Sequence, residues 1–545
     1  MNNILNYKSI SGIIFLFLFL ALLPFSTAVS APGSGTAAIN PSSDVIAGSE
    51  GEWVITYTAA ESFSTGQISV LIPDGWSDPQ QSDSSAEGYI TVSSQGTLSA
   101  TPVSISGKLI TISVDTLSNG QTVTLIYGSD DISVNGRAIS QQNAQSGVQF
   151  TVSSHPNGSS PQQISTSPSL NVIAGSISAL EFITPAPVVE AGEVTPVIRI
   201  QSVDQYGNPS QVASDQTVDL SSGSTAGEFS IEGGTQFSDT SSVIIEAGKD
   251  TVSFYYRDTS VGVQSITASA AGQAWDTAQQ DVTVNPSDCF RIAVSPQDTT
   301  LTAGEFGIYL VKIEDQYGNS CPVPSDQAIR LYATGGAFYL PSDHSSPISE
   351  ITIPASESSV NVDYMNTEME NILGYLLIFS DEDGKSPSLE STSTSVYVDP
   401  SSADLNVSTL GSDKFTATAD GSEEVTLTTE VRDSYGNPVA GSSVLFEVSG
   451  SGNSVVQPIG LTGSDGIATG TLSSTVAELK TVKGTIDGSY IADSLEIDFT
   501  AGPVDLAVST ISSDKAAATA DGADEVTLTV QVSDSEGNPV SNSSV

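Results

Sequence analysis

Few side chains in this sequence could carry out chemistry. The 545 residues include only two histidines, His155 and His344, and two cysteines, Cys289 and Cys321. The histidines fall in different predicted domains, so they cannot join the cysteines in a zinc site of ordinary spacing. His344 lies in a polar stretch typical of an exposed loop, whereas a catalytic base needs an orienting partner. We therefore expect no catalytic or cofactor-binding residues and no enzyme activity.

Neighbouring carboxylates offer two further kinds of chemistry. Pairs such as 130–131 and 423–424 would suit glycoside hydrolysis only if two carboxylates faced each other across a cleft. Asp381, Glu382 and Asp383 cluster oxygen ligands in a predicted loop, which makes them the best calcium candidates. They lack the spacing of an EF-hand loop, and solvated turns are the simpler interpretation. We expect no cofactor, with calcium as the alternative at these three residues.

The two cysteines fall in one predicted domain. Cys289 precedes its first strand and Cys321 lies in the turn after its second strand. A disulfide joining neighbouring strand ends is therefore predicted, in keeping with an oxidising compartment. Two unpaired thiols are the alternative.

One short motif occurs four times and organises the chain. It is Asp-x-Tyr-Gly-Asn, with Glu536 in place of Tyr in the last copy, and Pro follows directly in three copies. Its Asp, Gly and Asn positions are Asp204, Gly207 and Asn208; Asp315, Gly318 and Asn319; Asp433, Gly436 and Asn437; and Asp534, Gly537 and Asn538. Each copy follows an alternating apolar run, which predicts a turn at a strand end. Asp can cap the turn backbone, Gly accepts positive φ and Asn tolerates the left-handed region. We interpret the motif as a structural turn, because one turn supplies too few oxygen ligands for calcium.

The copies are spaced by 111, 118 and 101 residues, which suits one small β-sandwich per repeat. Residues 404–439 and 505–540 are identical at 25 of 36 positions, as expected for a tandem duplication. The predicted segments are a signal peptide at 1–30, a sandwich without the motif at 31–175, and repeats at 176–285, 288–399, 402–501 and 503–545. The last repeat holds half a sandwich, so we expect a fragment or a truncated coding region.

Charge and the first residues indicate the compartment. Residues 1–30 combine Lys8, an apolar run and small residues, which is typical of an export signal. No later stretch is apolar enough to span a membrane. The net charge of −48 disfavours nucleic acid and anionic membranes as partners. We expect a secreted or cell-surface, extracellular protein, with solubility, calcium association or a high-salt habitat as explanations of the charge.

Aromatic residues near the N-terminus could stack on sugars. Trp53 and Tyr57 share the parity of Ile55 on one predicted strand, which indicates core packing. Trp76 lies beside a predicted turn and is the one attractive exposed platform.

Residues 402–501 and 503–545 resemble the bacterial Ig-like group 1 domain of invasin and intimin. The resemblance rests on residues 419–428, 433–439, 444–446 and 462–471, in this order. Residues 31–175 resemble Ig-like domains of secreted surface proteins, on residues 72–76 and 124–128. The resemblance implies an all-β chain of tandem Ig-like β-sandwiches, which the short linkers, each containing Pro, would hold in an extended array. No outer-membrane barrel precedes the repeats, so an inverse-autotransporter layout is not expected.

The function implied is structural, a cell-surface stalk or adhesin whose extracellular ligand, a glycan or a protein, the sequence does not identify. The alternative is a non-catalytic accessory region of a large secreted polysaccharide-active enzyme. A third hypothesis is an array of carbohydrate-binding modules.

Overall fold

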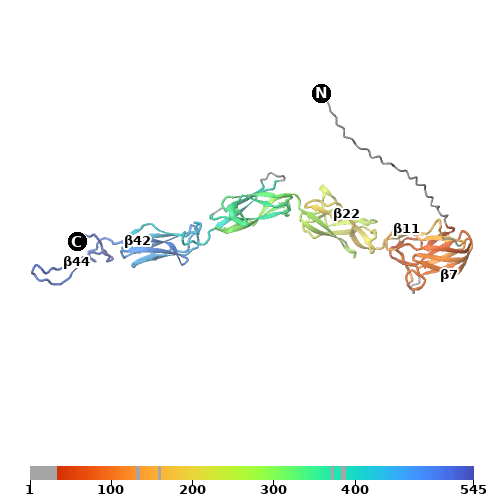
Figure 1. The fold of residues 1–545 in the computed structure, drawn as a ribbon, viewed down its shortest axis with the longest axis horizontal. Coiled ribbons are helices and arrows are strands. Elements are labelled where there is room, and N and C mark those ends of the chain that lie inside the picture. The colour runs from red at the N-terminus through yellow and green to blue at the C-terminus, as the bar shows by residue number, and fades with distance from the viewer. Residues whose placement is uncertain (1–32, 130–135, 158–160, 370–373, 382–387) are drawn as a thin grey trace, which may run out of the picture. The chain divides into compact units, whose positions relative to one another are not determined.

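A computed structural model describes residues 33–129, 136–157, 161–369, 374–381 and 388–545 (Figure 1). The predicted signal peptide, 1–30, lies outside these residues. Regular structure in the described ranges is β-strand apart from one 3-10 turn, η1 (Gly234–Gln236). The prediction of an all-β chain with tandem sandwiches is confirmed.

Internal contacts divide the chain into two units, which we describe separately. The first includes residues up to 189 together with 193–258 and 263–283. The second includes 190–192, 259–262 and 284–545. The exact domain boundaries expected from the sequence stay predictions.

The first sandwich is the largest. Its main sheets have the strand orders β1-β4-β9-β6 and β13-β12-β5-β8-β7, and smaller sheets join β11-β14-β2 and β10-β3. Its strands are β1 (Thr36–Asn40), β2 (Val45–Ile46), β3 (Glu50–Gly51), β4 (Trp53–Thr58), β5 (Phe63–Leu71), β6 (Ile90–Ser94), β7 (Thr97–Ser106), β8 (Leu109–Leu117), β9 (Thr122–Tyr127), β10 (Ala138–Ile139), β11 (Gln145–Gln149), β12 (Thr151–His155), β13 (Gln162–Gln163) and β14 (Ser169–Ile173).

The next two pairs of sheets share one topology. The orders are β15-β17-β22-β19-β20 with β16-β24-β23-β18-β21, and β25-β27-β32-β29-β30 with β26-β34-β33-β28-β31. The strands of the earlier pair are β15 (Ile177–Phe182), β16 (Val188–Glu190), β17 (Ile198–Asp204), β18 (Gln216–Ser222), β19 (Glu228–Ser230), β20 (Asp239–Thr240), β21 (Ser242–Ile245), β22 (Thr251–Arg257), β23 (Gly262–Ala270) and β24 (Ala278–Asn285). Those of the later pair are β25 (Cys289–Ser295), β26 (Thr299–Thr302), β27 (Phe306–Asp315), β28 (Gln327–Ala333), β29 (Ala337–Leu340), β30 (Asp343–Ile348), β31 (Glu350–Ile353), β32 (Ser359–Met365), β33 (Tyr375–Ser380) and β34 (Thr392–Asp399).

The fourth pair of sheets is smaller, and one hairpin follows it. The orders are β35-β37-β40-β39 and β36-β42-β41-β38, and β43 pairs with β44. The strands are β35 (Thr409–Ser412), β36 (Thr416–Thr418), β37 (Val425–Glu430), β38 (Val444–Val448), β39 (Asn453–Val456), β40 (Ile467–Ser474), β41 (Leu479–Ile486), β42 (Ser489–Thr500), β43 (Thr510–Ser513) and β44 (Leu528–Gln531).

The period-2 sequence pattern explains the cores. In β4 and β37, buried residues alternate strictly with partly exposed ones. The two sheets of a sandwich turn these faces toward each other, and in the first, third and fourth sandwiches residues of both sheets form one buried cluster. The alternating positions Phe254 and Tyr256 of β22, and Val362 and Tyr364 of β32, are fully buried in this way.

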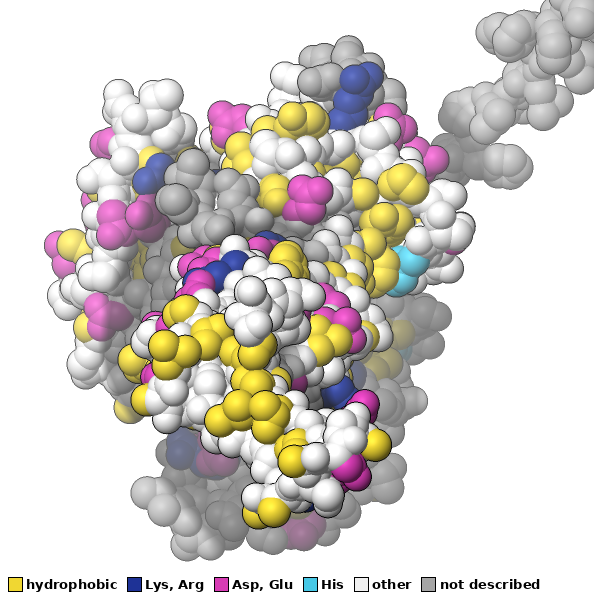
Figure 2. Space-filling model, turned by 90° about the vertical axis from the view of Figure 1, so that its left-hand side faces the viewer, with side chains coloured by type: hydrophobic (Ala, Val, Ile, Leu, Met, Phe, Trp, Pro, Cys, Tyr) yellow, Lys and Arg dark blue, Asp and Glu magenta, His cyan; other side chains and the backbone are white. Residues whose placement is uncertain are grey.

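Among the described residues, no second sheet covers the β43–β44 hairpin. All residues of both strands are exposed, including Ile511 at 67% and Leu528 at 63%. Figure 2 faces the side on which Figure 1 draws the C-terminal residues, and it shows apolar side chains gathered on the nearest part. The alternating pattern of this repeat therefore has an apolar face without a core.

Candidate functional site

The four repeated turns have the same internal hydrogen bonds. In the first, Oδ1 of Asp204 accepts from the backbone N–H groups of Tyr206 and Asn208, both at 2.9 Å. The corresponding pairs of distances are 2.9 and 2.9 Å at Asp315, 2.9 and 2.8 Å at Asp433, and 3.0 and 2.8 Å at Asp534. The turn glycines have φ between 81° and 89°, a region that a residue with a Cβ rarely adopts. The residue types of the motif are therefore those that the turn geometry requires.

The second carboxylate oxygen joins the turn to the start of its own domain. Oδ2 of each Asp accepts from the side-chain amide of the turn Asn at 2.9 or 3.0 Å. It also accepts from a backbone N–H in the segment that enters the domain. These donors are Gly175 at 2.8 Å, Ser287 at 3.2 Å, Ser401 at 2.9 Å and Gly502 at 2.9 Å.

The aspartates are buried and fully engaged. Asp315 and Asp433 are completely inaccessible, and Asp204 and Asp534 are each 2% exposed. Burial by itself would raise the pKa of these carboxyls, but the bonds from the Asn side chain and from backbone amides outweigh it. The pKa of each is therefore lowered from 3.8. Because N–H groups already occupy both oxygens, a calcium ion could bind only by displacing them.

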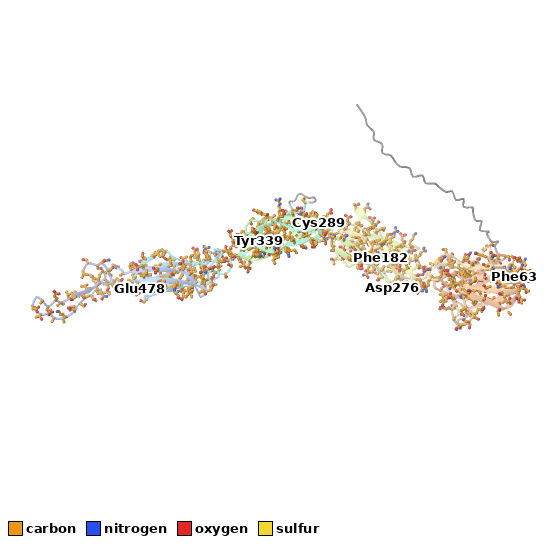
Figure 3. All side chains as sticks on the ribbon, in the orientation of Figure 1. Phe63, Phe182, Asp276, Cys289, Tyr339 and Glu478 are labelled. Atoms are coloured by element: carbon orange, nitrogen blue, oxygen red, sulfur yellow. A yellow bond between two sulfur atoms is a disulfide. The ribbon has the colours of Figure 1, made fainter. Side chains whose placement is uncertain are left out.

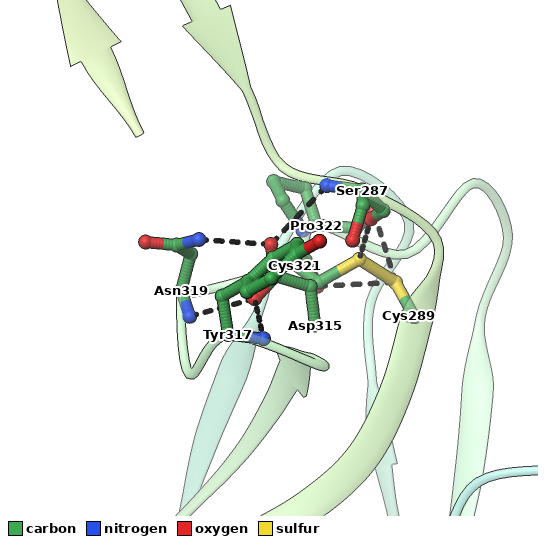
Figure 4. The surroundings of a disulfide bond; sticks show 7 residues. All are labelled: Ser287, Cys289, Asp315, Tyr317, Asn319, Cys321 and Pro322. Carbon is green, nitrogen blue, oxygen red and sulfur yellow. Dashed lines mark hydrogen bonds between the residues drawn. A yellow bond between two sulfur atoms is a disulfide. The ribbon is translucent and has the colours of Figure 1, made fainter. Parts of the chain in front are cut away.

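Beside one of these turns the structure contains the bond between Cys289 and Cys321 (Figure 4). The two Cα atoms are 5.5 Å apart, an ordinary separation for a disulfide. Cys289 is the first residue of β25, and Cys321 follows the turn after β27. The bond thus fixes the beginning of the domain to the same turn that binds Ser287 through Asp315.

His344 differs from its prediction as a loop residue. It lies in strand β30, stacks on Phe306 with ring centroids 3.8 Å apart, and its Nε2 lies 2.7 Å from Oδ2 of Asp363. Sequence reasoning missed this carboxylate partner, because Asp363 is on β32 and reaches His344 only through sheet pairing. Within the described residues no hydroxyl or thiol is hydrogen-bonded to this pair, which joins a partly exposed imidazole to a buried carboxylate and has no nucleophile beside it.

His155 lies far from that pair in sequence and belongs to the first sandwich. It is 6% exposed at the end of β12, and Nε2 is 3.1 Å from Oε1 of Gln67. Burial lowers the pKa of this imidazole, so the neutral form is favoured.

The calcium candidates are only partly described. Asp381 accepts from the side chain of Gln327 and from the backbone of Leu389, both at 3.0 Å, whereas Glu382 and Asp383 lie outside the described residues. The pair 130–131 also lies outside them. Within the described ranges no group of three His, Cys, Asp or Glu side chains could hold a metal ion. Calcium at Asp381 therefore stays a prediction.

Trp76 was expected to be an exposed platform, and this expectation was wrong. The side chain is 2% exposed and packs edge-on against Trp53, with centroids 4.6 Å apart, and against Phe150 at 5.0 Å. The turn that carries Trp76 folds over the sheets, so the ring completes the core of the first sandwich. A sugar cannot stack on it.

The segments that enter the domains were also missed as partners of the turn. Gly175, Ser287, Ser401 and Gly502 share no side-chain type, since each contributes only a backbone N–H. The one signal in the sequence was the recurrence of Asp at the first position of all four turns, which a turn alone does not require. Figure 3 shows the side chains of the domains on which these turns lie.

Comparison with known proteins gives one family match. The model of the bacterial Ig-like domain (group 1) matches residues 407–500, which contain β35 to β42 and the turn at Asp433. Residues 407–500 are a bacterial Ig-like domain of group 1. The resemblance inferred from the sequence of this repeat is confirmed. No curated protein sequence matches the chain significantly.

Solved structures that match parts of this chain include bacterial surface proteins. FdeC, described as an Escherichia coli adhesin, is 19% identical over 61% of this chain and 100% of its own, with a TM-score of 0.35. Invasin, described as a bacterial integrin-binding protein, is 15% identical over 65% of this chain and 67% of its own, with a TM-score of 0.31. The surface layer protein SbsC, domains 1–6, is 14% identical over 91% and 64%, with a TM-score of 0.20. In the described part of the chain, no helix is long and apolar enough to span a membrane.

Proposed function

We propose that this protein is an exported structural component of a cell surface, in which tandem Ig-like domains form a stalk. The observation that carries the proposal is the bond from each turn Asp to the segment that enters its domain. It occurs in all four repeats, at Gly175, Ser287, Ser401 and Gly502. A buried, ionised carboxylate that is hydrogen-bonded to the start of each domain fixes the direction in which the chain enters. A spacer needs a defined chain direction at every domain, and this hydrogen bond supplies it in each repeat.

Two further features support a spacer. Pro adjoins three of the four entering segments, at Ser287, Ser401 and Gly502, and limits backbone rotation there. An acidic surface disfavours collapse of one domain on another. On the face that Figure 2 shows, the acidic side chains lie in several separate small groups. A binding role as an adhesin would need a ligand-binding surface in addition, and the burial of Trp76 removes the sugar platform that the sequence offered.

The experiment is to locate the protein on intact cells that produce it. Antibodies against residues 33–175 and against residues 402–501 should both label intact cells, and external protease should remove both signals. Deletion of the interior repeat 288–399 should shorten the distance between the two labelled segments without loss of surface display. Recovery of the protein only from the medium, together with polysaccharide hydrolysis by the full-length product, would favour the accessory region of an enzyme instead.

A further inference from the structure

The side chain of the turn Asn makes bonds that its own domain does not need. In the first unit, Nδ2–H of Asn208 donates to the carbonyl of Gln142 at 2.7 Å, and Oδ1 accepts from the N–H of Ala144 at 2.8 Å. Both partners lie between β10 and β11 of the first sandwich. The primary amide thus pairs with backbone groups two residues apart, as a neighbouring strand would.

The same pair of bonds occurs at the other three turns, all within the second unit. Asn437 bonds to the carbonyl of Thr367 at 2.8 Å and to the N–H of Met369 at 2.9 Å. Asn538 bonds to Thr475 and Ala477, both at 2.9 Å. Asn319 bonds to Thr259 at 2.7 Å and Val261 at 3.3 Å, in the loop 259–262 that belongs to this unit.

At each turn, the Asn binds the carbonyl of one residue and the N–H of the residue two positions later. The side chains of these residues differ among the four turns, but the spacing is the same. Three of the four loops also occupy the same connection, between β22 and β23, β32 and β33, and β40 and β41. The Asn therefore recognises the backbone of the loop, and the sequence of the loop is free to vary.

The turn Tyr adds a second contact on the preceding domain. Tyr206 packs against the core cluster of the first sandwich, beside Gly48. Tyr435 lies against Gly304 in the same way, and Tyr317 against Gly192. A Cβ on any of these glycines would overlap the Tyr ring. In the last turn Glu536 replaces the Tyr, so this contact is lost while the Asn bonds remain.

We propose that the repeated turn is a docking element whose partner is the end of another sandwich of this type. The Asn amide binds a carbonyl and an N–H two residues apart, and the Tyr covers an adjacent glycine. The Asp positions the Asn, since Oδ2 accepts from the same amide. The inference rests on the proposed stalk for its biological use, but its contacts can be tested without reference to the cell surface.

The test uses the full exported chain with Asn437→Ala, and Asn453→Ala as the matched control. The control variant loses the same type of side chain from the same sandwich, and the amide of Asn453 donates to the carbonyl of Ser449 within that sandwich at 3.0 Å. Backbone hydrogen exchange of the peptide containing Met369 should be about 5- to 10-fold faster in Asn437→Ala, the size expected for one lost hydrogen bond. A pair of spin labels at exposed positions 352 and 445 should show a broader distance distribution. The control should change neither.

A second arm changes the partner and leaves the turn intact. Gly48→Ala should speed exchange of the peptide containing Ala144, because the methyl group displaces the Tyr206 ring. Gly120→Ala is the control, since Gly120 also has positive φ, 85° against 67°, but a Cβ there would meet nothing within 4 Å. Exchange in the core strands β37 and β4 reports whether each variant is folded.

If both test variants are folded and exchange at the rates of their controls, the docking role is wrong even where surface display persists. If hydrogen exchange changes as expected but the protein is absent from the cell surface, the docking role is supported and the proposed stalk function is wrong.

Discussion

At the scale of single residues, the turn Asp holds together more of the structure than the other residues of the motif. One carboxylate shapes the turn through Oδ1 and joins the entering segment to the Asn through Oδ2. A neutral amide cannot replace it, because an Asn at this position would present N–H groups to the donors that now face Oδ2. The motif therefore needs an ionised Asp rather than any polar residue.

Asp433→Asn should accordingly destabilise the fourth sandwich by about 1–3 kcal/mol, since buried donors lose their acceptor. Native-state hydrogen exchange of β37 and β40 measures this local stability. The third sandwich, probed at β27 and β32 in the same sample, serves as the internal control. Unchanged exchange in β37 would contradict the role given to Asp433.

The lowered pKa values also predict a pH dependence. A carboxyl with a depressed pKa in the folded state contributes stability above its unfolded value, 3.8, and that stability is lost as pH falls through the folded pKa. Opening of the fourth sandwich should therefore become easier below about pH 4, and Asp433→Asn should have a weaker dependence in this range. Exchange rates corrected for intrinsic pH effects provide the measurement. An equal pH dependence in both proteins would assign the loss of stability to other carboxyls.

At the scale of strands and turns, two repeats hold the start of the domain in different ways. In the first unit, Oγ of Ser210 donates to the carbonyl of Gly175 at 2.7 Å. Cys321 occupies the corresponding place after its turn and bonds covalently to Cys289. The disulfide thus reinforces an attachment that elsewhere consists of hydrogen bonds.

Replacing both Cys289 and Cys321 by Ser should therefore weaken the third sandwich without unfolding the chain. The bond closes a loop with a sequence separation of 32, for which chain entropy gives about 3–4 kcal/mol. Exchange should accelerate in β27 and β32 and stay the same in β37 and β40. The unmodified exported protein should contain no titratable thiol. Two reactive thiols would show that the cysteines are not bonded after export.

The sequence predicts a structural feature well when the pattern that determines the feature lies within one strand or turn, and poorly when the feature depends on residues far apart in the sequence. Alternation at Phe254 and Tyr256 predicts a strand with one buried face, because the period is set within the strand. Trp76 could not be placed, because its burial depends on Phe150, which only the folded sheets bring near. The same holds for His344 and Asp363, and for the Asn bonds of each turn, which depend on backbone groups of another domain. The sequence recurrence of the motif indicated a shared role but not the partner.

At the scale of the whole molecule, repulsion between the acidic domains and the restraints at the joints between domains both favour an extended chain. The net charge of −48 makes contact between domain sides unfavourable, while the turns and the Pro residues restrain the joints. Repulsion between exposed charges is screened within about 10 Å at 0.1 M salt, whereas buried bonds are screened much less. The two contributions can therefore be separated by ionic strength.

Small-angle scattering of the exported chain should thus show an extended, semi-rigid particle that shortens only slightly from low to high salt. The variant Asn208→Ala/Asn319→Ala/Asn437→Ala should be more compact at every salt concentration and shorten more as salt rises, because it keeps only the Pro residues and the repulsion, and salt weakens the repulsion. Asn453→Ala again controls for loss of an Asn side chain. A compact wild-type particle at low salt would remove the physical basis of a stalk. A triple variant that scatters like the wild type would instead assign the extension to the Pro residues and to charge, since these are the restraints that the variant retains.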